Sequence, residues 1–357
     1  MLLRLRLIGD VVFTTPLIRA LRRAWPDAHL AYLVEPQAAP IVTNNPWLDE
    51  VIVAPRTRGL RRLAEDVRLA RELRRRRFDV AVDLHGGPRS AWLAWASGAR
   101  ERIGYDIDGR RWMYTRVVRR ARSLTPPRHS VLNQWDLLEA IPGWHEAAPT
   151  PGRDPVEMAN DPASDRRVSD RLRRANVSER HALVVIHVSA GNPFRRWPER
   201  FFVETVQALV EHEPSRRIVL SSGPSDRDAA ARIAAAARQQ LGAAADRIVE
   251  LGELDLQELR ALIGRSVLFI GGDTGPLHMA ATTGTAIVGI YGPTLAVRSA
   301  PWRAPDAHTA SIELPEVACR PCDQRVCAPG DFRCLTTLTP DRVIAAAESA
   351  LAPTLTH

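Results

Sequence analysis

The pattern that most constrains this chain is an alternation of short apolar segments with longer amphipathic segments, which runs twice along its length. The short segments have the length and composition of buried strands, and the segments between them have the apolar spacing of helices. Strands that alternate with helices form parallel sheets with right-handed crossovers. The predicted strands are residues 2–8, 31–34, 51–53, 80–84, 183–188, 217–221, 248–251, 267–270 and 286–290.

A proline-rich segment divides the two runs. Residues 142–162 contain five prolines, a density that neither a helix nor a central strand tolerates. The length of 357 residues also exceeds one ordinary domain and suits two. We therefore expect an α/β fold of two doubly wound, Rossmann-like domains that face a central cleft. They are residues 1–155 and residues 156–357, the second ending in a helix at 341–351.

Positive charge is concentrated in the first predicted domain. All 49 basic residues are arginines, and residues 1–150 hold 25 of them against 16 acidic residues, whereas the rest of the chain is close to neutral. This asymmetry indicates an anionic partner: nucleic acid, an anionic lipid surface or a phosphorylated substrate. No apolar run approaches the roughly 18 residues that span a bilayer, and the arginines within residues 2–8 are unlike a signal peptide.

Asp10 follows the first predicted strand directly. Ligands of open parallel sheets bind at the carboxyl ends of the strands, so a carboxylate there lies where sites form and can act as a general base. The alternative is an Asx turn that joins the strand to the next helix. Thr15 as N-cap and Pro16 at the first helical position predict where that helix begins.

Two loops of the second predicted domain have the composition of anion-binding turns. At residues 269–278 a strand ends in paired glycines before Asp273, and a helix begins near Pro276; its N-terminus favours anions, and Asp273 can accept hydrogen bonds from sugar hydroxyls. At residues 187–198 another strand ends before Ser189, and Arg195 or Arg196 can bind phosphate oxygens through a bidentate fork. The alternatives are a helix cap in the first loop and solvated arginines in the second.

Basic residues also follow the third predicted strand. Arg56, Arg58, Arg61 and Arg62 are candidates for binding acceptor phosphates, and the alternative is a solvated helix face. His85, after the fourth strand, is a candidate substrate contact. The four cysteines, Cys319, Cys322, Cys327 and Cys334, lie in one short loop, a spacing that suits a reducing compartment and leaves structural zinc, disulfides and free thiols open.

Six segments, taken together and in order, are distinctive: residues 6–16 (RLIGDVVFTTP), 83–86 (DLHG), 102–105 (RIGY), 189–198, 272–278 (GDTGPLH) and 290–294 (IYGPT). Through them, almost the whole chain resembles glycosyltransferase family 9, the ADP-heptose:lipopolysaccharide heptosyltransferases. Many members also have a late cysteine-rich loop similar to residues 319–334.

The resemblance implies a GT-B fold, in which the first domain binds the acceptor and the second binds the nucleotide-sugar, and transfer with inversion at the anomeric carbon. It places Asp10 as the general base, Asp273 against the transferred heptose, and Thr274 and Gly275 beside the donor phosphates. Arg195 takes the place of the family's usual lysine, which keeps the charge but changes its geometry. Ser189 and His278 fall within the donor motifs, and Asp226 is the candidate for the family's ribose-binding glutamate.

The implied activity is heptosyl transfer from ADP-L-glycero-D-manno-heptose to a lipopolysaccharide inner-core acceptor, with no cofactor needed for catalysis. The acceptor is lipid-anchored and phosphorylated, so we expect a cytoplasmic enzyme that contacts the anionic inner face of the cytoplasmic membrane. One alternative is a family member that uses another nucleotide-sugar or another cell-envelope glycan. A remoter one is a nucleic-acid-binding module, although few aromatic residues interrupt the basic stretches.

Overall fold

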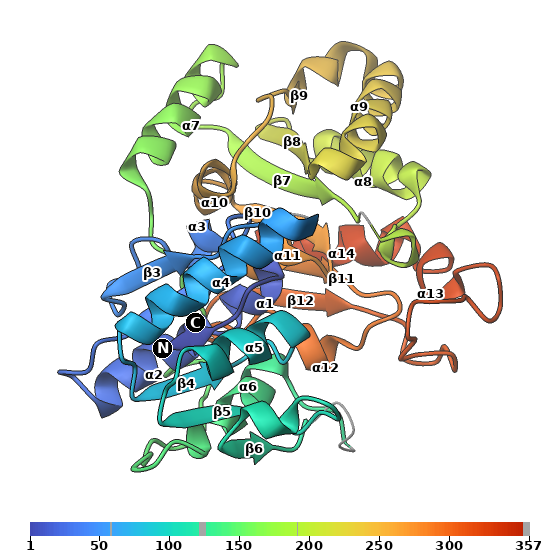
Figure 1. The fold of residues 1–357 in the computed structure, drawn as a ribbon. Coiled ribbons are helices and arrows are strands. Elements are labelled where there is room, and N and C mark those ends of the chain that lie inside the picture. The colour runs from blue at the N-terminus through green and yellow to red at the C-terminus, as the bar shows by residue number, and fades with distance from the viewer. Residues whose placement is uncertain (58, 121–125, 191, 353–357) are drawn as a thin grey trace. The chain divides into compact units, whose positions relative to one another are not determined.

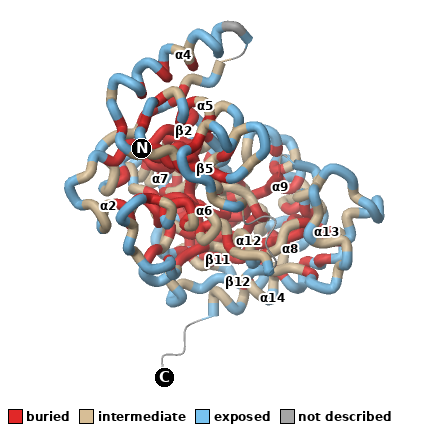
Figure 2. The backbone as a smooth tube through the Cα atoms, turned by 60° about the horizontal axis from the view of Figure 1, so that its bottom comes forward, coloured by how far each residue is buried: buried red, intermediate tan, exposed pale blue. Residues whose placement is uncertain are grey.

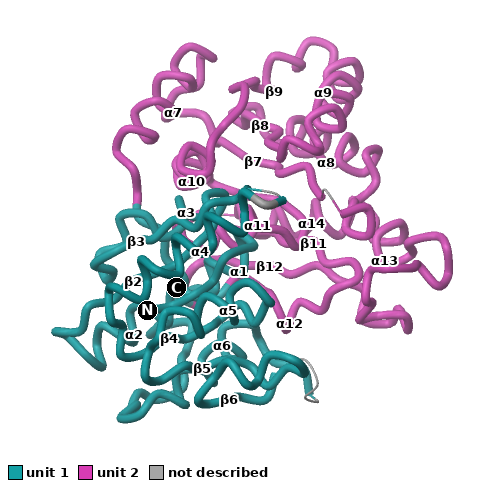
Figure 3. The backbone as a smooth tube through the Cα atoms, in the orientation of Figure 1, with its two compact units in different colours: residues 1–159, 302–304 teal, residues 160–301, 305–357 magenta. Residues whose placement is uncertain are grey.

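The structure, a computed structural model, describes residues 1–57, 59–120, 126–190 and 192–352. The chain forms two compact units, which Figure 3 distinguishes by colour. Unit 1 comprises residues 1–159 and 302–304, and unit 2 comprises residues 160–301 and 305–357. The boundary between the two domains was predicted from the sequence after residue 155. Residues 156–159 stay with unit 1, where Val156 and Met158 are buried and the Val156 amide donates to the Trp302 carbonyl.

Unit 1 is built on a parallel sheet of six strands in the order β3-β2-β1-β4-β5-β6 (Figure 1). The strands are β1 (Leu2–Leu3), β2 (Ala31–Val34), β3 (Glu50–Val53), β4 (Val80–Asp83), β5 (Glu101–Tyr105) and β6 (Arg116–Val118). The helices are α1 (Ile8–Val12), α2 (Thr15–Ala24), α3 (Ala39–Val42), α4 (Gly59–Arg75), α5 (Pro88–Ala96) and α6 (Ser130–Glu139), with a 3-10 turn η1 (Arg111–Met113).

Unit 2 has a second parallel sheet, in the order β12-β11-β10-β7-β8-β9. Its strands are β7 (Ala182–Val188), β8 (Arg216–Ser222), β9 (Ile248–Val249), β10 (Leu268–Gly272), β11 (Ala286–Ile290) and β12 (Thr309–Ile312). Its helices are α7 (Pro162–Arg174), α8 (Glu199–His212), α9 (Arg227–Leu241), α10 (Leu256–Gly264), α11 (Gly275–Ala280), α12 (Ala296–Ser299), α13 (Arg333–Thr336) and α14 (Pro340–Leu351). The 3-10 turns are η3 (Pro193–Arg195), η4 (Pro224–Asp226) and η5 (Gly242–Arg247).

The two sheets share one topology. Counted along the chain within each unit, both have the strand order 3-2-1-4-5-6 of Rossmann folds, so the prediction of two doubly wound α/β units is confirmed. In this topology the first and fourth strands are neighbours whose connections leave in opposite directions, which opens a crevice at their carboxyl ends. The crevice lies at β1 and β4 in unit 1 and at β7 and β10 in unit 2.

Apolar side chains cover both faces of the central strands, as parallel sheets between helices require. Ile186, Phe269 and Ile287 of unit 2 are fully buried. Helices α8, α9 and α14 contribute to one continuous apolar core beneath the sheet, and α11 contacts β10 and β11. In Figure 2 the buried positions gather in the interior. This packing holds the strand ends, and therefore the loops after them, in fixed positions.

The N-terminal segment differs from the predicted strand at residues 2–8. β1 ends at Leu3, although backbone pairing with β2 continues to Leu5, whose carbonyl accepts from the Glu35 amide at 2.9 Å. The chain then enters α1, so Asp10 lies in the first turn of a short helix rather than in a turn after a strand. Burial of Arg4 beside Asp10 accounts for this change, since its side chain is directed into the unit rather than to solvent.

The sequence predicts the central elements better than the peripheral ones. The C-terminal helix expected at residues 341–351 is confirmed as α14. Thr15 is not a cap: it opens α2, and its hydroxyl donates to the Val12 carbonyl and accepts from the Glu157 amide. The strands β5 and β6 lack a predicted counterpart because short segments that contain charged residues, such as Glu101, Arg102 and Arg116, do not have the apolar pattern of a buried strand.

Candidate functional site

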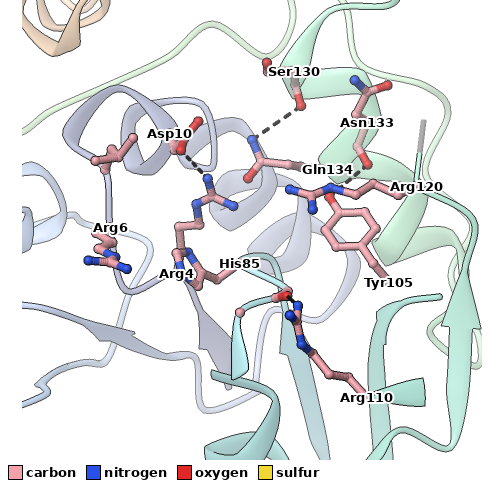
Figure 4. Close-up of a pocket in the computed structure, with 13 residues that line it drawn as sticks. Arg4, Arg6, Asp10, His85, Tyr105, Arg110, Arg120, Ser130, Asn133 and Gln134 are labelled. Atoms are coloured by element: carbon pink, nitrogen blue, oxygen red, sulfur yellow. Dashed lines mark hydrogen bonds and ion pairs between the residues drawn. The ribbon is translucent and has the colours of Figure 1, made fainter. Parts of the chain in front are cut away.

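A cavity of about 480 Å³ opens at the crevice of unit 1 (Figure 4). Its walls come from the segments after β1 and β4, the connection from β5 onward, and α6. Four arginines face a single carboxylate in this lining, so the cavity favours an anionic ligand. The lining residues are Arg4, Arg6, Leu7, Asp10, His85, Gly86, Gly87, Tyr105, Arg110, Arg120, Ser130, Asn133 and Gln134.

Asp10 is the acidic residue of this cavity, and Arg4 orients it. The Arg4 guanidinium contacts the Asp10 carboxylate through one terminal nitrogen (Figure 4), while the other donates to the Leu84 carbonyl after β4. The Arg4 side chain is only 10% exposed, whereas that of Asp10 is 35% exposed toward the cavity. A buried cation therefore fixes the direction of a carboxylate that remains open to a ligand. Sequence reasoning missed Arg4, which alternates with apolar residues as in an ordinary strand.

The turn after β4 is built around the buried carboxylate of Asp83. It accepts hydrogen bonds from the amides of His85 and Gly86, at 2.9 and 3.0 Å, and from the hydroxyls of Ser90 and Tyr114, at 2.9 and 2.6 Å. Burial raises the pKa of Asp83, and these hydrogen bonds oppose the rise. The turn is thus rigid, and it presents His85 to the cavity.

His85 lies in the cavity as a neutral imidazole. Burial and the charges of Arg4 and Arg6 lower its pKa to about 4. Its Nδ1 atom is buried and has no hydrogen-bond partner among the described residues. A neutral imidazole can hydrogen-bond to a hydroxyl group, and contact between His85 and the substrate stays a prediction.

Of the arginines predicted on and before α4, Arg56, Arg61 and Arg62 do not line this cavity. Arg56 contacts Gln37 and Glu35, Arg62 lies 3.7 Å from Asp66, Arg61 is exposed on α4, and Arg58 lies outside the described residues. Glu35 and Asp66 are both held by Arg89. Its guanidinium contacts them at 2.9 and 2.6 Å and also donates to the Pro55 carbonyl. This buried network joins α4 and α5 to the sheet and is structural in character.

The crevice of unit 2 brings Arg195 and Asp273 together. The Arg195 guanidinium donates to the Asp273 carbonyl at 2.8 Å and lies 3.4 Å from its carboxylate. Thr294 donates to that carboxylate at 2.6 Å, and His278 lies 3.4 Å from it. Burial acts to raise the pKa of Asp273, but His278, Arg195 and Thr294 outweigh it and lower the pKa to about 2. Asp273 is therefore an ionised anchor for its neighbours, and the resemblance did not reveal these contacts.

The beginning of α11 carries no side-chain cap. Thr274 is the N-cap residue by position, but its hydroxyl donates to the Gly272 carbonyl at 3.2 Å instead of accepting from an amide of the helix. Gly275 is the first residue of α11. The alternative that Asp273 or Thr274 serves to cap this helix is thus wrong.

Ser189 and Asp226 meet in a smaller cavity of about 260 Å³ beside this crevice. The Ser189 hydroxyl is buried and has no hydrogen-bond partner among the described residues. Arg196 also lines the cavity; it donates to the Ala190 carbonyl and lies 3.8 Å from the Asp226 carboxylate. Trp197, the next residue along the chain, is buried, and its indole donates to the Leu338 carbonyl.

A third cavity, of about 340 Å³, opens at the carboxyl ends of β8 and β9 and the beginning of α9. Its lining is largely apolar and includes Pro224, Ala231, Leu251 and Leu254, with backbone groups of the strand ends between them. Flat aromatic ligands bind in apolar slots of this kind. Sequence reasoning missed it because short apolar residues at strand ends have no distinctive spacing.

His187, at the end of β7, makes the stability of the protein sensitive to acid. Burial lowers its pKa to about 4, whereas an unfolded histidine titrates near 6.5. The contribution of His187 to the free energy of unfolding is therefore fully present above about pH 6.5, and it is lost as the pH falls toward 4. We expect His187→Gln to remove roughly 2 kcal/mol of the stability lost between pH 7.5 and pH 5, measured by urea unfolding. The exposed His145→Gln is the control, and identical pH dependence in all three proteins would refute this assignment.

The structure does not support the predicted zinc site at the cysteine loop. Among the described residues, which include all four cysteines, no group of three or more His, Cys, Asp or Glu side chains is arranged to hold a metal ion. Cys334 belongs to the apolar core, and burial raises the pKa of its thiol to about 11. Cys319, Cys322 and Cys327 are partly exposed.

Comparison with known proteins identifies the family of this chain. A family model for glycosyltransferase family 9 (heptosyltransferase) matches residues 67–329. Lipopolysaccharide heptosyltransferase 3 of Escherichia coli is 28% identical over 301 residues, 84% of each chain. Lipopolysaccharide heptosyltransferase 2 of Salmonella typhimurium is 24% identical over 348 residues, 96% of each chain.

Solved structures with low identity share the fold. A family 9 glycosyl transferase from Veillonella parvula superposes with a TM-score of 0.82 at 22% identity, over 98% of this chain and 96% of that one. An Escherichia coli heptosyltransferase solved with ADP superposes with a TM-score of 0.70 at 18% identity, over 98% of each chain. No described helix is long and apolar enough to cross a membrane. From the family match and the two Rossmann-like units, the chain belongs to glycosyltransferase family 9 and is a glycosyltransferase of GT-B type.

Proposed function

We propose that this enzyme transfers a heptose from ADP-L-glycero-D-manno-heptose to a lipopolysaccharide inner-core acceptor, with inversion at the anomeric carbon. The observation that carries the proposal is the carboxylate of Asp10, which Arg4 directs into an arginine-lined cavity. The names of the relatives, lipopolysaccharide heptosyltransferases 2 and 3, support the donor sugar and the acceptor class. The neighbour solved with ADP supports the nucleotide.

The cavity of unit 1 has the chemistry of an acceptor site. Arg6, Arg110 and Arg120 line it and suit phosphate or carboxylate groups of a core saccharide. Asp10 takes the proton of the attacking hydroxyl as general base, and His85 hydrogen-bonds to a neighbouring hydroxyl. Arg56, Arg58, Arg61 and Arg62 lie on or before α4, and we assign them to more distant charges of the same acceptor.

Unit 2 supplies the donor side. We assign the apolar cavity at β8 and β9 to the adenine, and Asp226 to the ribose. Ser189, Thr274, Gly275 and Arg195 are assigned to the diphosphate, whose negative charge grows as the bond to the sugar breaks. Asp273 and His278 position Arg195 and the beginning of α11, because both side chains are buried and engaged with each other.

Arg195→Ala should weaken binding of the ADP-sugar about tenfold to a hundredfold, since a hydrogen bond to a charged group contributes about 1.5–3 kcal/mol. Isothermal calorimetry with ADP measures this change, and binding of the acceptor should not respond. Arg200→Ala, at an exposed arginine of α8, is the matched control. Equal ADP affinity in Arg195→Ala and wild type would remove Arg195 from the donor site.

The overall proposal is tested by mass spectrometry of reactions with truncated lipopolysaccharide cores and a panel of nucleotide-sugars. We expect a mass gain of one heptose with ADP-heptose alone, retained in EDTA because no cofactor is needed. A gain with a different nucleotide-sugar, or with another cell-envelope glycan, would replace the proposed substrates. Because the acceptor is lipid-anchored, we place the enzyme in the cytoplasm at the inner face of the cytoplasmic membrane.

A further inference from the structure

Two tryptophans lie exposed and in contact with each other on unit 1. Trp95, near the end of α5, is 44% exposed, and Trp112, in η1, is 61% exposed. Their rings are 5.8 Å apart in an edge-on arrangement. The Trp112 indole nitrogen donates to the Gly109 carbonyl at 3.2 Å, so its polar atom is satisfied within the protein. Large apolar rings left open in this way mark an interaction surface.

The surrounding segment is strongly basic. Residues 100–120 contain seven arginines and three acidic residues. Arg100, Arg111, Arg116 and Arg119 are exposed; Arg111 lies 3.6 Å from Asp106, and Arg116 lies 2.9 Å from Glu101. The two apolar rings, surrounded by excess positive charge, complement a surface that carries negatively charged groups over an apolar interior.

The same segment forms part of the acceptor cavity. Arg110 directly precedes η1, lines the cavity and donates to the Gly86 carbonyl (Figure 4). Arg120 and Tyr105 line it from the two ends of the segment. Leu7, 68% exposed, adds an apolar side chain to the lining. Whatever the tryptophans bind is therefore held close to the cavity.

We propose that Trp95 and Trp112 dock unit 1 on a membrane containing anionic lipids, beside the cavity that receives the acceptor. The inference rests on the proposed function in one respect, namely that the acceptor is anchored in such a membrane. Tryptophan rings favour the interface between headgroups and acyl chains, and each arginine near the surface adds attraction to anionic headgroups. A protein partner fits less well because the rings lie among like charges rather than within a larger apolar patch.

The test measures binding without any acceptor, by cosedimentation with vesicles of 30% phosphatidylglycerol and 70% phosphatidylcholine. Trp95→Ser/Trp112→Ser should bind at least tenfold more weakly than wild type, since two large side chains lose their burial in lipid. Trp112→Ser alone, at the more exposed position, should show an intermediate loss. The control is Val267→Ser/Val297→Ser, which removes exposed apolar side chains from unit 2 and should bind as wild type does.

Two results would overturn the proposal: no binding of the wild type to these vesicles, or equal binding of wild type and both tryptophan variants. Capture of another protein in place of vesicles would likewise reassign the surface. Measurements of turnover distinguish the membrane-docking proposal from the proposed enzymatic function. The tryptophan variants should lose activity on vesicle-embedded acceptor but keep it on a delipidated core fragment, whereas a wrong substrate assignment abolishes both activities in wild type and leaves vesicle binding intact.

Discussion

Replacing Asp10 by asparagine is expected to lower kcat about a thousandfold, within the range that general base catalysis contributes. The amide has nearly the same shape as the carboxylate but cannot take a proton from the attacking hydroxyl. Because Asp10 lies in the cavity of unit 1 and the donor residues lie in unit 2, the affinity for ADP should be unchanged. Single-turnover transfer, followed by mass spectrometry, gives the rate of the chemical step.

Asp27→Asn, at an exposed position of the same unit, is the matched control and should keep the wild-type rate. Arg4→Lys should retain part of the activity, since a lysine can still approach the carboxylate but loses the second contact to the Leu84 carbonyl. If Asp10→Asn turned over within a few-fold of wild type, Asp10 would not be the base, and the site would have to be sought elsewhere.

Replacing Arg89 by methionine is expected to lower the free energy of unfolding by roughly 3–5 kcal/mol, because it leaves two buried carboxylates without their cation. Glu35 and Asp66 both have side chains that are about nine-tenths buried, and both contact the Arg89 guanidinium. Urea unfolding followed by far-ultraviolet circular dichroism measures the change. Unit 1 should unfold first, since the network lies wholly within it.

The triple variant Arg89→Met/Glu35→Gln/Asp66→Asn tests the reason for that loss. With no charge left unpaired, it should recover much of the stability. Arg232→Met removes an arginine from an exposed pair with Glu199 and should leave the unfolding midpoint unchanged. A loss in Arg89→Met no larger than in Arg232→Met would show that the network contributes little.

Sequence reasoning placed the candidate residues by their position in the topology. His85, Ser189 and Asp273 follow strands at the two crevices, and alternating strands and helices were enough to predict those strand ends, whereas Asp10 lies in α1, beyond the end of β1. What the sequence leaves open is which side chains turn inward. The buried pairing of Arg4 with Asp10, and that of Arg195 with Asp273, join residues whose partnership depends on the packing of the surrounding strands.

Charge patterns were the least informative part of the sequence. The arginines at and before α4 remain candidates for acceptor contacts, but the sequence did not reveal that Arg56 and Arg62 neighbour buried acids held by Arg89, which lies far along the chain. Arg110 and Arg120, which do line the cavity, stand in a segment without recognisable periodicity. Likewise, the cysteine spacing suggested a metal site, but the burial of Cys334 in an apolar core depends on tertiary packing that spacing does not encode.

The return of residues 302–304 to unit 1 bears on how the polypeptide matures during synthesis. Trp302 packs its ring 4.7 Å from that of His129, and its indole donates to the Asp154 carbonyl at 2.8 Å. These contacts form only after residues 160–301 of unit 2 have been translated. A nascent chain that ends at residue 159 therefore contains the strands of its first sheet but lacks the tryptophan that packs on His129, so we expect unit 1 to finish folding only when most of unit 2 has been made.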